Sequence, residues 1–183
     1  MLKFLKNKKT EVFFIVFFII VFIIATKLMP HLAISFSKVS GLTVRGDVLL
    51  CSVISLGLLG GRKKAAYFGI ISGFLFDIFI GNPYAFSPLV FLLCGYFAGP
   101  FCKPFSHRTP LSAMLVAAML VWIKSLFSFF YLVAVTKNVG IASLIFAGIL
   151  PEYIVNVLIS AVIFSIMRIL MALFRIQTVQ AGR

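Results

Sequence analysis

Long apolar runs, separated by short polar segments, make up almost the whole chain. An apolar run of about 20 residues is long enough to cross a bilayer as a helix. The breaks fall at Gly, Pro, Asn and basic residues, which end helices and form turns. The pattern predicts six spans, at residues 11–29, 47–61, 65–80, 86–102, 111–135 and 141–170. The first run has no small-residue cleavage site after it and is expected to be a retained span rather than a signal peptide.

The composition agrees with a membrane environment. Hydrophobic residues make up 62% of the 183 positions and charged residues 11%, against about 45–50% and 25% in soluble domains. We therefore expect an all-α polytopic membrane protein, in which residues 1–183 form a single transmembrane domain, a bundle of about six helices.

The net charge of +13 does not point to nucleic acid, because the basic residues gather between the apolar runs. With the N-terminus inside, twelve Lys and Arg residues fall on the inner side and four on the outer side. Basic residues are enriched in cytoplasmic loops. The count predicts that both termini are cytoplasmic.

No pattern for enzymatic or metal chemistry stands out. The three cysteines have no CxxC spacing, and neither His31 nor His107 has a second ligand at metal-site spacing. Nucleotide-binding loops, zinc-protease motifs and nucleophile motifs are also missing from the sequence. We expect no catalytic residues, no metal and no cofactor.

A carboxylate lies inside the third run. Asp77 shares one helix face with Gly69, Gly73 and Gly81, because these residues recur at intervals of four. Small residues at this spacing allow a second helix to approach closely. Asp77 is therefore expected to face protein rather than lipid, where a charge costs at least about 2.5–3.5 kcal/mol.

Other polar residues lie at similar depth in other runs. Lys124 in the fifth run and Glu152 in the sixth are expected to converge with Asp77, with Lys124 paired to Glu152 or to Asp77; Asn156 is a further polar candidate, on the same face of the sixth run as Glu152. Such a group is either a polar functional site or a buried charge pair that fixes helix register. Asp47 is expected to be an interface residue or a helix cap.

A second pair of small residues, Gly95 and Gly99 in "GYFAG", is typical of helix packing or of a partner-protein face.

These residues carry a resemblance to a known family. The segment from Gly46 to Gly99 resembles the core of the rod shape-determining protein MreD family, through Asp47, the Arg62–Lys64 turn, Gly73, Asp77, Gly81, Pro83, Gly95 and Tyr96. The segment "LPEYIVNVLIS" resembles the family's last span, through Leu150, Pro151 and Asn156. Gly46, Ala85 and Ser87-Pro88 depart from the residues that the family often has there.

The resemblance implies a non-catalytic scaffold in the bacterial inner membrane, part of the machinery for cell elongation and peptidoglycan synthesis. Its implied partners are the bitopic protein MreC and, indirectly, MreB filaments and the elongation glycosyltransferase–transpeptidase pair. The scaffold would bind partner helices through the small-residue grooves.

The family is also similar to the six-helix substrate-binding components of energy-coupling-factor transporters. The alternative is therefore a subunit that binds a vitamin or another small solute, with a pocket near Asp77 and Glu152. The outer segments offer few groups that could hold a polar solute, which favours the scaffold.

Overall fold

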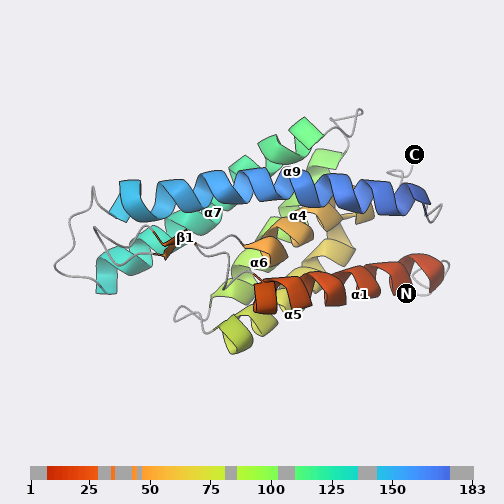
Figure 1. Cartoon of the computed structure of the whole chain (residues 1–183), viewed down its shortest axis with the longest axis horizontal. Coiled ribbons are helices and arrows are strands. Elements are labelled where there is room, and N and C mark those ends of the chain that lie inside the picture. Colours follow the sequence, from red (N-terminus) through yellow and green to blue (C-terminus); the bar gives the residue numbers. More distant parts are fainter. Residues whose placement is uncertain are drawn as a thin grey trace.

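The structure is a computed structural model that describes residues 8–28, 34–35, 43–44, 47–80, 86–102, 110–135 and 144–173. Apart from the two-residue strands β1 (Ile34–Ser35) and β2 (Thr43–Val44), which pair antiparallel, all the regular structure described is helical (Figure 1). The expected all-α architecture is confirmed.

The helices follow the apolar runs closely. Their bounds are α1 (Lys8–Ile23) with the π-helical turn η2 (Ile24–Leu28), α4 (Val48–Gly60), α5 (Arg62–Ile80), α6 (Ser87–Ala98) with the 3-10 turn η3 (Pro100–Cys102), α7 (Pro110–Val135), and the π-helical turn η4 (Leu144–Ile149) leading into α9 (Leu150–Leu173). Among the described residues, α9 is the one helix both long enough and apolar enough to cross a membrane. That all six runs cross the bilayer stays a prediction.

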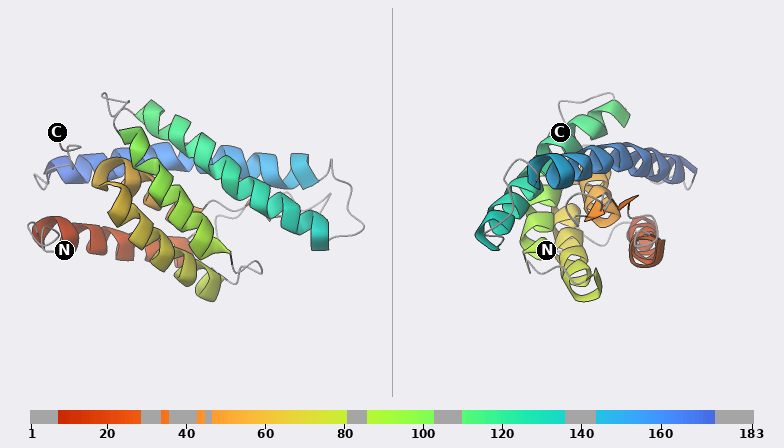
Figure 2. Two further views of the ribbon diagram at one scale, coloured as in Figure 1. Left: turned by 180° about the vertical axis from the view of Figure 1, so that it is seen from behind. Right: turned by 60° about the vertical axis from the view of Figure 1, so that its left-hand side comes forward.

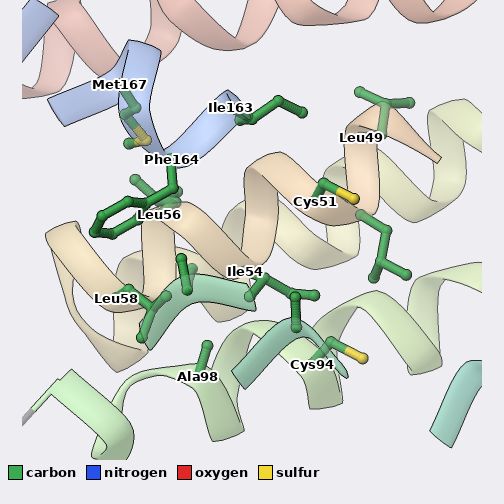
Figure 3. Packing of buried hydrophobic residues seen from close by; sticks show 14 of the residues in the cluster. Leu49, Cys51, Ile54, Leu56, Leu58, Cys94, Ala98, Ile163, Phe164 and Met167 are labelled. Carbon is green, nitrogen blue, oxygen red and sulfur yellow. The ribbon is translucent and has the colours of Figure 1, made fainter. Parts of the chain in front are cut away.

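The short helix α4 is the centre of the bundle. All 13 of its residues are buried, and it contacts α1, α5, α6, α7 and α9. Figure 2 shows these helices arranged around it, and Figure 3 shows its side chains packed between those of α6 and α9. A helix that is apolar on all sides is typically buried, either among other helices or in a membrane. The hydroxyls of Ser52 and Ser55 donate hydrogen bonds to carbonyls one turn back in the same helix. These two buried hydroxyls therefore need no partner from another helix.

Helices α5 and α6 form a tight antiparallel pair. A Cβ on Gly69 would lie 2.4 Å from the Phe91 carbonyl oxygen, and one on Gly73 would lie 2.3 Å from the Pro88 Cα. The small-residue face of α5 is therefore covered by α6 of the same chain. The expected close approach of a second helix thus occurs at these two glycines, but the helix is α6 of the same chain, and no space is left between the two backbones for a partner helix.

The same pair explains the glycines of α6. A Cβ on Gly95 would lie 2.5 Å from the Ala65 carbonyl oxygen, and one on Gly99 would lie 2.7 Å from the Arg62 Cα. Both glycines thus pack inside the molecule, against the first turns of α5.

The basic segment Arg62–Lys64 does not connect two helices. It is helical and forms the first turn of α5. Gly61 alone redirects the chain, with φ of 94°, a value that glycine adopts without steric cost. The Arg62 guanidinium lies 4.5 Å from the centre of the Tyr96 ring, and Lys64 Nζ lies 5.6 Å from the centre of the Phe14 ring. These contacts tie the start of α5 to α6 and α1.

The start of α1 and the end of α9 lie at the same end of the bundle (Figure 1). The start of α5, with its three basic residues, lies at that end too (Figure 2). The basic residues are thus concentrated at one end of the described structure.

Candidate functional site

Three charged side chains meet where the central helix begins. Lys124 of α7 forms ion pairs with Asp47, which immediately precedes α4, and with Glu152 in the first turn of α9. We call these three residues the ion cluster. It joins three helices far apart in the sequence.

The shortness of α4 creates this site. Because α4 begins only at Val48, Asp47 lies at its N-terminal end, level with the middle of the 26-residue helix α7. The N-terminal end of a helix carries a partial positive charge, which favours a carboxylate. The Asp47 carboxylate is therefore stabilised both by the N-terminal end of α4 and by the Lys124 ammonium.

The three side chains differ in their access to solvent or lipid. The exposed fraction is 4% for the Asp47 side chain, 15% for Lys124 and 30% for Glu152. The cluster is thus closed at Asp47 and partly open at Glu152.

Asn156 extends the cluster by one turn of α9. The Asp47 backbone N–H donates to Asn156 Oδ1 over 2.6 Å, and the Cys51 thiol donates to the Asn156 carbonyl oxygen over 3.2 Å. Asn156 is fully buried, and its Nδ2 has no hydrogen-bond partner among the described residues. The side chain thus secures the first turn of α4 against α9.

The sequence predicted this site only in part. Lys124 does pair with Glu152, one of the two partners left open for it. Asp47 does occupy the N-cap position of α4, one of the two places expected for it, but its side chain makes no capping hydrogen bond and is buried in the ion cluster instead. The feature of the sequence that could have predicted this position of Asp47 is the shortness of the second run. A short span begins deeper in the bundle than the longer spans beside it.

The expected convergence of Asp77 with Lys124 is also wrong. Lys124 is bound by Asp47 and Glu152, whereas Asp77 lies on α5, which packs against α4 and α6. Asp77 is half-buried, and its Oδ1 is buried without a hydrogen-bond partner in the described part of the chain. Gly81 and Pro83, the remaining candidates of this segment, lie outside the described residues.

Held by two ion pairs and a buried amide, the arrangement fixes the register of α4, α7 and α9. Within the described residues no group of three metal-ligating side chains occurs. Chemically, the cluster compensates the buried Lys124 ammonium with two carboxylates inside an apolar bundle.

Comparison with protein families bears on the whole chain. The family model described as rod shape-determining protein MreD matches residues 8–174. The chain belongs to the MreD family. The resemblance seen in the sequence is confirmed. MreD proteins are membrane proteins of a non-enzymatic family with a role in determining rod shape. Searches of curated proteins and of solved structures gave no match.

Proposed function

We propose that this MreD protein is a multi-pass scaffold of the cell-elongation machinery in the bacterial inner membrane, with a single transmembrane domain and both ends cytoplasmic. The family match over residues 8–174 is the observation that carries the proposal. The proposed partner is a bitopic protein of the MreC kind, through which the scaffold acts on MreB filaments and on the enzymes that synthesise peptidoglycan.

The distribution of apolar side chains supports a scaffold. Exposed apolar residues run along α1 and along α9, where they recur every three or four residues: Val12, Ile15, Val16, Ile19, Ile20 and Ile23 on α1, and Ile154, Leu158, Val162, Ile166 and Ile169 on α9. Surfaces of this kind pack against lipid or against other membrane helices. The described polar groups of the bundle, in contrast, mostly bind one another.

The concentration of basic residues at one end supports the orientation. Arg62, Lys63 and Lys64 begin α5 at the end of the bundle where α1 begins and α9 finishes. This end is the cytoplasmic one if the chain follows the usual bias of basic residues.

The solute-binding alternative gains no support from the crevice between α1 and α4. It is lined mainly by aromatic and aliphatic side chains, among them Phe14, Phe17 and Phe68, and its cavity volume is about 10 Å³. That is close to the least space that one water molecule needs.

The proposal is tested by depleting the protein from a rod-shaped host in which its gene is the only copy. The expected result is rounded cells, restored to rods by the wild-type chain. A parallel purification in mild detergent is expected to recover the bitopic partner. Cells that stay rod-shaped after complete depletion of the protein would contradict the proposed scaffold function.

A further inference from the structure

The start of α5 carries three basic residues in a row, and aromatic rings hold two of them in place. The Arg62 guanidinium lies 4.5 Å from the centre of the Tyr96 ring and donates a hydrogen bond to the Tyr96 hydroxyl over 3.2 Å. Lys64 Nζ lies 5.6 Å from the centre of the Phe14 ring. A cation over the face of an aromatic ring is attracted by the ring. Both side chains are therefore positioned by the protein itself.

The backbone that carries these residues is fixed as well. A Cβ on Gly99 would lie 2.7 Å from the Arg62 Cα and 2.9 Å from its N, so the first turn of α5 packs directly on the end of α6. Lys63, between the two positioned residues, is exposed and forms no ion pair with any described residue. The segment thus presents one free ammonium between two ordered cations.

The carboxylates of the chain do not balance this positive charge. Asp47 and Glu152 pair with Lys124. Asp77 lies near the opposite end of α5. The starts of α1 and α5 together hold five basic residues and one acidic residue, Glu11. This end of the bundle therefore attracts a partner that is negatively charged.

The three cations lie at the boundary of the apolar part of the bundle. Phe14, whose ring Lys64 covers, is 3% exposed and belongs to the buried core. Tyr67 follows Lys63 by one turn on the same face of α5 and is 65% exposed. Tyrosine beside basic residues at the end of an apolar helix is typical of the headgroup level of a membrane. The phosphate of a lipid already lies at this level, whereas an acidic soluble protein would have to reach down to it.

We infer that the start of α5 binds the headgroup of an anionic phospholipid, with Arg62 and Lys63 in contact with its phosphate and Lys64 adding to the attraction. A guanidinium has five N–H donors, and Arg62 uses one of them on Tyr96, so the others are free for phosphate oxygens. Basic clusters beside membrane helices recognise anionic lipids in this way. The inference goes beyond the scaffold function and requires only that this end of the bundle lies at a membrane surface.

The test uses the full-length protein in mild detergent, with phosphatidylglycerol as the probe and phosphatidylcholine of the same acyl chains as the reference. Native mass spectrometry measures the bound lipid over a titration. The wild type is expected to bind phosphatidylglycerol more tightly than phosphatidylcholine. Arg62→Gln and Lys63→Gln are each expected to weaken the binding of phosphatidylglycerol about fivefold, and the double variant more than either, with no change for phosphatidylcholine.

Lys27→Gln is the matched control, because Lys27 is an exposed lysine in η2, at the other end of the first helix. It is expected to bind phosphatidylglycerol as the wild type does. Arg62→Lys keeps the charge but loses the planar fork of donors, so its affinity is expected between those of the wild type and Arg62→Gln. If Arg62→Gln lowers the melting temperature, Lys63→Gln decides, since the exposed Lys63 holds no described contact in place.

Three results would each overturn the lipid site: equal binding of the two lipids by the wild type, equal affinity of Lys63→Gln and the wild type for phosphatidylglycerol, or an equal loss in Lys27→Gln. A photo-crosslinker at Tyr67 is expected to capture lipid in living cells. Capture of a protein there in place of lipid would assign the basic segment to a protein partner and also overturn the inference. The scaffold function is tested separately, by cell shape after depletion.

Discussion

The backbone N–H of Asp47 donates a hydrogen bond to the side chain of Asn156 over 2.6 Å, between residues 109 positions apart in the chain. The bond lies beside the ion pairs of Lys124 with Asp47 and Glu152. The central helix α4 is therefore held at its first turn by polar contacts and along its length by apolar packing.

Removing the shared cation is expected to be the most damaging single change in the ion cluster. Lys124→Met leaves two carboxylates facing each other, and breaking a buried ion pair costs about 3–5 kcal/mol. We expect the melting temperature in detergent and the yield of folded protein to fall. The triple variant Asp47→Asn, Lys124→Met, Glu152→Gln should recover much of the loss. A triple variant as unstable as the sum of the single changes would contradict the cluster.

The two carboxylates are expected to differ. Asp47→Asn should lower stability more than Glu152→Gln, because the Asp47 side chain is 4% exposed and that of Glu152 is 30% exposed. Thermal unfolding of the two variants side by side measures the difference, and the reverse order would show that Lys124 depends mainly on Glu152.

Replacing Asn156 tests the bond to Asp47. Asn156→Ala leaves the buried Asp47 N–H without its acceptor, at a cost of about 1–3 kcal/mol. Faster hydrogen exchange in the first turn of α4 is expected, with little change in α6. Ser165→Ala serves as the control on the same helix, and equal exchange rates in the Asn156 variant and wild type would contradict the role.

The close approach of α5 and α6 predicts which glycines tolerate a side chain. Gly69→Ala and Gly73→Ala should destabilise the protein, since the new Cβ would lie 2.4 Å and 2.3 Å from backbone atoms of α6. Gly60→Ala is the control, because its nearest neighbour is the flexible end of the Leu56 side chain at 3.0 Å. Protein yield and melting temperature check the order. Loss of cell shape in a Gly73 variant with normal stability would instead point to a partner on this face.

The orientation can be tested with cysteine labelling. Cys51 and Cys94 are buried and should not react, so the background needs only Cys102→Ser. Cysteines introduced at Ser40 and Asn138 are expected to react with an impermeant thiol reagent from outside the cell, and one at the exposed Lys63 is not. Reaction at position 63 would reverse the proposed topology.

The sequence by itself determined the helices. Apolar runs broken by Gly, Pro and basic residues placed them within a few residues, because helix formation in an apolar environment depends mainly on local composition and on internal backbone hydrogen bonds. It also identified the family, through motifs such as Gly73, Asp77 and Gly95, and it suggested that Lys124 and Glu152 pair.

Only the tertiary structure decided which polar groups meet. It placed Asp47 in the ion cluster and left Asp77 outside, because membership depends on which helices are neighbours and on how deep a 13-residue helix begins. Spacing along one helix shows that Gly69, Gly73 and Asp77 share a face, but not that α6 of the same chain covers the two glycines. Helix periodicity is a local property, whereas the choice of neighbour depends on contacts between residues far apart in the chain.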